Sequence, residues 1–302
     1  MRTTTMLPKT PWAAAWCALF VLTGGVQGPA MAQTADTVRL AQASPASASP
    51  VKRDAASPLQ AAASARRKWS VYWGWNRSTY SNSDIHFWGA DHDFTLSSVK
   101  ANDMQADVTT ENIFGTFLSP ANMTLPQTNL RIAYQVSPDT AWAINLDHMK
   151  YVVTPDQTVA FSGRINNDPQ AGASRTLSTN YLNFEHTDGL NVVTLEYEKQ
   201  YPLVGYQGAR AFWLVGAGVV VPKSNVTMSM IGQTRNDKFH LAGYAVNAAV
   251  GLEKDFATDF FIRSTAKFGH VNMNDVVTSA RGDKASHRFQ FSEFSITAGY
   301  RF

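Results

Sequence analysis

Apolar and polar residues alternate with a period of two at the end of the chain. Every second residue of the last segment is apolar: Phe294, Ile296, Ala298, Tyr300 and Phe302. Successive side chains of a β-strand point to opposite faces of the strand. This pattern therefore predicts a final strand with one face toward an apolar medium and the other toward a polar medium.

Earlier segments of the chain also have the character of strands. Some alternate in the same way, and two are predicted as strands because they are rich in apolar and aromatic residues. The alternating segments are 129–136, 142–147, 193–201, 242–253 and 260–268, and the other two are 69–80 and 209–221. Together with the final segment they predict eight strands within residues 69–302, which is enough chain for one domain.

The predicted connections alternate between short and long without exception. The short ones are 137–139, 202–208 and 255–257, and the long ones are 81–126, 152–189, 222–238 and 271–287. Outer-membrane barrels have short periplasmic turns, longer extracellular loops and an even number of strands. We therefore predict an all-β fold, an eight-stranded antiparallel transmembrane β-barrel, over an ordinary soluble sheet.

Two short segments leave the strand number open. Residues 84–87 and 93–96 also look like pieces of strands, and a ten-stranded barrel would follow if both crossed the membrane. The regular alternation of short and long connections would then be lost. We favour their placement as strand extensions above the membrane, within the first outer loop.

The region before the barrel has a different composition. Residues 1–32 have the basic start, the apolar stretch and the Ala30-Met31-Ala32 cleavage site of a secretory signal peptide. Residues 33–68, rich in Ala, Ser and Pro, predict a disordered periplasmic tail. The one cysteine, Cys17, lies inside the signal peptide, so the mature chain is expected to lack thiol chemistry. The net charge of +3 is too small to indicate nucleic-acid binding.

The inward positions of the predicted strands carry charges of both signs. They are Arg131, Asp147, Glu196, Glu198, Glu253, Arg263, Lys267, Glu293 and Arg301. The interior of an eight-stranded barrel is just wide enough for side chains. Because unpaired buried charge is costly, we expect a network of ion pairs that fills the lumen. A polar channel or proton path is the alternative.

Candidate chemistry gathers at the outer end. The seven histidines, His86, His92, His148, His186, His240, His270 and His287, all fall there in the predicted topology. Imidazole beside carboxylate or hydroxyl suits general-base catalysis, with Ser78, Ser81, Ser83 or Thr187 as possible nucleophiles. The candidate catalytic residues are His86, His148, His186 and Asp188. The candidate metal ligands are Asp84, His86, Asp91 and His92, although their spacing matches no zinc motif. No motif identifies a cofactor.

Several segments resemble known sequences. The last ten residues resemble the C-terminal signal by which bacterial outer-membrane barrels are recognised for assembly. Five stretches together resemble a family of small outer-membrane barrels of Gram-negative bacteria with the OmpA/OmpX-like architecture: GWNR at 74–77, SDIHF at 83–87, DFTL at 93–96, LDHMKYV at 146–152 and NFEHTDGLN at 183–191. The resemblance implies the barrel, the outer membrane, contact with its lipids and with the barrel-assembly machinery, and no catalytic residue.

Three functions follow from these observations. The first is a non-catalytic outer-membrane protein that binds a ligand or surface partner at its outer loops or passes a small solute. The second is a hydrolase that modifies outer-leaflet lipid, and the third is a metal-binding surface protein. Convergence of His86, His148 and His186 beside a hydroxyl would favour the hydrolase.

Overall fold

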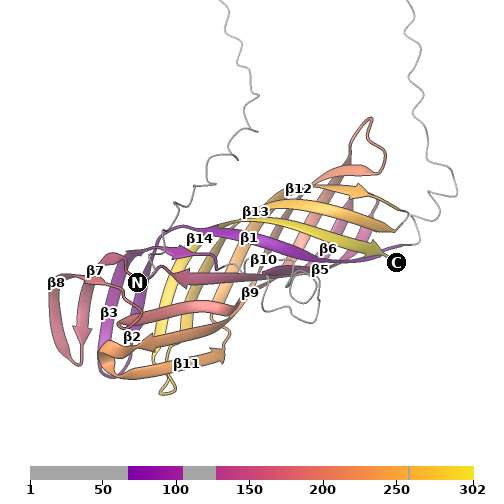
Figure 1. Ribbon diagram of the computed structural model, residues 1–302. Coiled ribbons are helices and arrows are strands. Elements are labelled where there is room, and N and C mark those ends of the chain that lie inside the picture. Colours follow the sequence, from indigo (N-terminus) through magenta and orange to yellow (C-terminus); the bar gives the residue numbers. More distant parts are fainter. Residues whose placement is uncertain (1–66, 105–126, 258) are drawn as a thin grey trace, which may run out of the picture. The chain divides into compact units, whose positions relative to one another are not determined.

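Eight antiparallel strands close into a ring in the computed structural model, which describes residues 67–104, 127–257 and 259–302 (Figure 1). In ring order they are β1 (Trp69–Tyr80), β5 (Thr128–Ser137), β6 (Thr140–Val153), β9 (Leu182–Pro202), β10 (Ala209–Met228), β12 (Gly243–Asp255), β13 (Phe260–Val277) and β14 (Lys284–Arg301). The predicted signal peptide and nearly all of the predicted tail lie outside the described residues. In the described part no helix is long and apolar enough to cross a membrane.

The first and last strands complete the ring. β1 pairs with β14 from Ser70 opposite Arg301 to Tyr80 opposite Phe291. The ends of the two strands also exchange backbone hydrogen bonds, from the Trp69 amide to the Phe302 carbonyl at 3.2 Å and from the Phe302 amide to the Trp69 carbonyl at 2.9 Å. The pairing of β1 with β14 therefore closes the ring of the predicted barrel.

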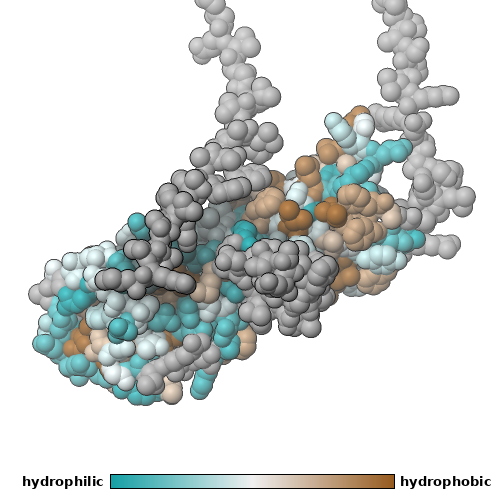
Figure 2. Space-filling view, in the orientation of Figure 1, coloured by the Kyte–Doolittle hydropathy of each residue, from teal (hydrophilic) through white to brown (hydrophobic). Residues whose placement is uncertain are grey.

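The outer surface of the ring is a belt of exposed apolar and aromatic side chains. In Figure 2 hydrophobic side chains gather on the barrel wall, whereas hydrophilic ones dominate the other end of the molecule. The belt includes Trp69, Ile132, Trp142, Ile144, Leu195, Trp213, Val215, Val246, Val250, Leu252, Phe268, Phe294, Ile296, Tyr300 and Phe302. Exposing so much apolar surface to water would be unfavourable. The outer surface of the ring therefore lies in lipid, as in outer-membrane barrels.

Four of the eight strands of the ring continue well beyond this belt. β9 has 21 residues, β10 has 20, and β13 and β14 have 18 each, against the 9–11 or so that a tilted strand needs to span a bilayer. Much of the predicted loops 152–189, 222–238 and 271–287 is therefore strand. The reason is a change of phase: in β14 the inward residues Phe289 and Phe291 are apolar, and from Phe294 onward the apolar residues point outward.

Six further strands build an outer extension on the same sheet (Figure 1). They are β2 (Ser83–Trp88), β3 (His92–Val99), β4 (Ala101–Asn102), β7 (Thr158–Ile165), β8 (Asp168–Thr176) and β11 (Gln233–Phe239). β2 pairs with the start of β14, β3 pairs with β2, and β4 pairs with the end of β6. They continue the wall above the ring, so the eight-stranded barrel is confirmed and neither predicted strand piece is a spanning strand.

The interior has two levels of different character. Inside the ring most of the large buried side chains are polar or charged, with a small apolar cluster of Phe212, Leu214 and Ala249, and inside the outer extension the buried side chains form one large apolar core. That core includes Ile85, Phe87, Phe94, Leu96, Phe184 and Phe289, all at most 2% exposed. Above the membrane the outer face meets water, so the apolar face of each strand turns inward.

Candidate functional site

Charged side chains of opposite sign are paired throughout the lumen of the ring. In the upper layer, Lys267 Nζ lies 2.6 Å from Asp147 Oδ2 and 3.1 Å from Glu196 Oε1. Arg131 donates from Nε to Glu196 Oε2 at 2.7 Å, and its Nη1 lies 2.8 Å from Glu198 Oε2. These pairs join β5, β6, β9 and β13 across the lumen, and all of the side chains are almost completely buried.

The lower layer is centred on Arg263. Its Nη1 donates to Glu198 Oε1 and to Glu253 Oε2 at 3.1 Å each, and its guanidinium lies over the Phe212 ring at 3.4 Å. Arg301 and Arg210 pair with Glu253 from the periplasmic end, and both also pair with Asp255. The predicted network of mixed charges that fills the lumen is confirmed.

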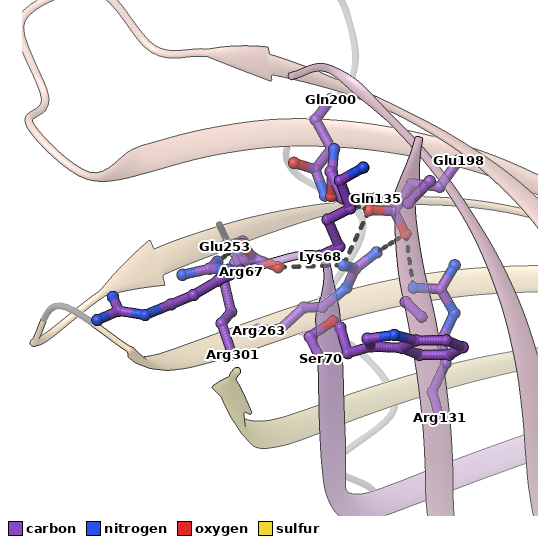
Figure 3. Close-up of a pocket in the computed structure, with 13 residues that line it drawn as sticks. Arg67, Lys68, Ser70, Arg131, Gln135, Glu198, Gln200, Glu253, Arg263 and Arg301 are labelled. Atoms are coloured by element: carbon purple, nitrogen blue, oxygen red, sulfur yellow. Dashed lines mark hydrogen bonds and ion pairs between the residues drawn. The ribbon is translucent and has the colours of Figure 1, made fainter. Parts of the chain in front are cut away.

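The periplasmic mouth of the lumen holds a small cavity. Figure 3 shows Arg131 and Arg263 directed toward Glu198, with Arg301 beside Glu253. The cavity is about 20 Å³, and a second one of about 10 Å³ lies among the side chains of the upper layer. A water molecule needs about 10–15 Å³ on this measure, so each cavity has room for only one or two waters.

The predicted catalytic residues take different partners. His86 faces outward on β2, where Nε2 lies 2.8 Å from Asp93 Oδ1 and the ring stacks on Trp88. His148 Nδ1 lies 2.7 Å from Asn191 Oδ1. Asp188 forms an ion pair with Lys223 at 2.9 Å. His186, by contrast, is completely buried in the apolar core of the outer extension.

His186 lies between a serine and a second histidine. Ser224 Oγ is 2.8 Å from its Nδ1, and His287 Nε2 is 3.3 Å from its Nε2. Tyr151 contacts both imidazole rings and shares a 2.9 Å hydrogen bond with Ser83. The sequence offered no sign of this cluster, because Ser224 and His287 lie on strands that were predicted to be loops.

Burial determines the charge of the histidine pair. It lowers the pKa of His186 to about 3, and burial together with the neighbouring His186 lowers the pKa of His287 well below its usual value. Both rings are therefore neutral near pH 7. His287 Nδ1 has no hydrogen-bond partner among the described residues. We assign the His287 proton to Nε2, where it is donated to His186, and the His186 proton to Nδ1, where it is donated to Ser224.

The predicted metal ligands divide into two groups. Asp84 accepts a hydrogen bond from the Ser98 amide at 2.7 Å, on the same hairpin as His86. His92 Nδ1 lies 2.9 Å from Asp91 Oδ1, and Arg281 also pairs with Asp91. The hydrogen bond with His92 and the pairing with Arg281 lower the pKa of Asp91. Within residues 67–104, 127–257 and 259–302, no three His, Cys, Asp or Glu side chains are arranged to hold a metal ion.

Comparisons with known proteins give matches only among solved structures. No protein-family model and no curated protein matches the chain. Neisserial surface protein A is 7% identical over 78% of this chain and 97% of its own, with a TM-score of 0.35. The outer membrane protein OprG from Pseudomonas aeruginosa is 11% identical over 78% and 96%, with a TM-score of 0.36. The attachment invasion locus protein of Yersinia pestis is 11% identical over 78% and 99%, with a TM-score of 0.31.

The ring and its belt define the class of protein. A closed ring of eight antiparallel strands with an apolar outer surface and a side-chain-filled interior is the architecture of small outer-membrane barrels. The predicted OmpA/OmpX-like fold and the location in the outer membrane of a Gram-negative bacterium are thereby confirmed.

Proposed function

We propose that this protein is a non-conducting outer-membrane barrel that binds a partner or ligand through its outer extension. The observation that supports this proposal is that side chains fill the interior both in the ring and in the outer extension. Ion-paired side chains occupy the ring, and an apolar core occupies the extension above it. The two cavities of about 20 and 10 Å³ have room for water but not for a larger solute.

The outward face of the hairpin of β2 and β3 supports a binding role. His86 stacks on Trp88 with ring centroids 5.0 Å apart, and Asp93 pairs with His86 from the neighbouring strand. Aromatic side chains held on a rigid strand can contact a partner at a low cost in conformational entropy. The Ser224–His186 pair does not favour hydrolysis, because both side chains are buried and His287 occupies the position that an orienting carboxylate would take.

Planar-bilayer recordings test the filled lumen. We expect the purified barrel to show no steady conductance at pH 7, because ion-paired side chains fill the ring and apolar side chains fill the extension above it. The variant Phe289→Ala with Phe291→Ala removes two rings from the outer core, and it should stay closed because the charged layers remain. An open porin reconstituted in the same way is the positive control. Stable ohmic steps from the wild-type protein would refute the proposal.

We propose, in addition, that the barrel-assembly machinery recognises the C-terminal strand. The Phe302 side chain is 58% exposed at the edge of the apolar belt and so contributes little to packing within the barrel. Phe302→Asp should therefore lower the amount of folded protein in the outer membrane several-fold in cells. The same variant should refold in detergent almost as well as wild type. Phe239→Asp, on the outer extension, is the control, and equal levels of both variants in the membrane would contradict the proposal.

A further inference from the structure

The lumen of the ring contains one more acid than it has bases. The buried acids are Asp147, Glu196, Glu198, Glu253 and Glu293, and the inward bases are Arg131, Arg263, Lys267 and Arg301. Arg210 and Asp255 at the periplasmic rim add one charge of each sign. An uncompensated buried charge costs several kcal/mol or more. A positive charge that these side chains do not provide, from a bound proton or another cation, is therefore needed to balance the fifth acid.

The excess charge lies at Glu293. Glu253 pairs with three arginines, Glu198 with two, Glu196 with Arg131 and Lys267, and Asp147 with Lys267. Glu293 is 3% exposed and forms no ion pair with a described residue. Its Oε1 accepts a hydrogen bond from Asn129 Nδ2 at 2.8 Å, and its Oε2 has no hydrogen-bond partner in the described part of the chain.

A single asparagine joins Glu293 to a second carboxylate. Asn129 Nδ2 donates to Glu293 Oε1 and also to Asp147 Oδ1, at 2.5 Å. Two carboxylates that accept from the two N–H groups of one amide nitrogen lie close together, and two like charges so close disfavour each other. The Asn129 oxygen accepts from Asn76 Nδ2, and the Asn76 oxygen is itself buried with no partner among the described residues. Glu293 Oε2 and Asn76 Oδ1 are thus two buried acceptors without a partner among the described residues, and on the Glu293 carboxylate such a position calls for a proton or another cation.

We propose that Asp147 and Glu293 hold one proton between them, so that the lumen is a proton-binding site at neutral pH. The proton lies mainly on Glu293, because Asp147 is already paired with Lys267. The charged or titratable groups that face this layer come from each neighbouring strand: Tyr72 and Tyr80 on β1, Arg131 on β5, Asp147 on β6, Glu196 on β9, Lys267 on β13 and Glu293 itself on β14.

The surroundings favour a proton over a metal ion. Toward the outside, the lumen is closed by the apolar core. Toward the periplasm, the mouth is lined by Arg67, Lys68, Arg131, Arg263 and Arg301, against only Glu198 and Glu253. Both small cavities are lined by Arg131, so a metal ion would have to pass a cluster of positive side chains to reach Glu293. A proton can move along one or two waters instead.

Infrared spectroscopy of the folded barrel tests the proposal directly. At pH 7 we expect a carbonyl band of a protonated carboxylic acid in the wild-type protein, shifted by exchange into D₂O. The band should be lost in Glu293→Gln and kept in Glu253→Gln, and a heat-modifiability gel would establish that each variant is folded. Because a glutamine side chain at this position needs no proton, Glu293→Gln should also remove the loss of stability expected of wild type as the pH rises above about 4.3, where a glutamate of the unfolded chain gives up its proton.

Each contrary result has a definite meaning. A wild-type spectrum without the acid band overturns the proposal, even if the variants do not fold. Persistence of the band in folded Glu293→Gln would overturn the assignment to Glu293. Disappearance of the band on addition of NaCl or CaCl₂ at constant pH would show that a metal ion, and not a proton, supplies the missing charge.

Discussion

Replacing Arg263 by methionine should lower the free energy of unfolding by about 3–5 kcal/mol, the usual cost of removing one partner from a buried ion pair. Arg263 is 1% exposed and pairs with both Glu198 and Glu253. Methionine fills part of the space but leaves the two acids less well compensated in the lumen. The measurement is the midpoint of guanidinium unfolding in detergent micelles, followed by tryptophan fluorescence.

Two further variants separate this effect from a general loss of stability. Lys199→Met removes the partner of Asp139 in an exposed pair at the periplasmic turn, and it should change the midpoint little. Adding Glu198→Gln to Arg263→Met should recover part of the loss, because one of the stranded charges is removed. A fully stable Arg263→Met barrel would show that the lumen network does not hold the ring together.

Acidification should weaken the outer extension through the histidine pair. The pKa of His186 is about 3 in the folded protein because of burial, against about 6.5 for an unperturbed histidine. Between these values the unfolded chain binds a proton that the folded chain excludes. The stability from this group is therefore complete above about pH 6.5. It is lost as the pH falls toward 3, by about 1.4 kcal/mol for each pH unit. The depressed pKa of His287 acts in the same direction.

The variant His287→Phe isolates this contribution. Tyr151, Phe184 and Phe289 already surround the ring, so a phenylalanine should fit at this position. The unfolding midpoint of the variant should fall less steeply than that of wild type between pH 7 and pH 4. His86→Phe, on the exposed face of β2, should keep the wild-type slope. Equal slopes for His287→Phe and wild type would show that the buried pair is not the source of the acid sensitivity.

The outer ends of the long strands are harder to predict from sequence than the parts in the membrane. Val271 and Met273 alternate with Asn272 and Asn274, which is the signal of a strand, but the apolar residues now point inward. When the phase of the membrane belt is applied to it, this segment is predicted as part of the long connection 271–287. The change of phase between Phe291 and Phe294 marks the same boundary in β14 and could have revealed the outer extension from sequence.

The candidate site was predictable only as a set of residue types. Alternation correctly assigned Arg131, Glu198 and Arg263 to the lumen, because the direction of a side chain depends on local strand geometry alone. The choice of partners could not follow, because Arg263 and Glu198 are 65 residues apart in the chain. In the same way, His186 and His287 are 101 residues apart, and only the pairing of strands brings them together.

The alternating pattern is therefore enough to predict the eight strands of the ring, its lipid-facing side and its closure into a barrel. These features follow from the two-residue period and the solvent on either side of the wall. The three-dimensional arrangement fixes which charges pair, that Glu293 forms no ion pair with a described residue, and that an apolar core fills the extension. Those outcomes depend on strand register and curvature, which bring distant residues within hydrogen-bond distance and leave no trace in local pattern.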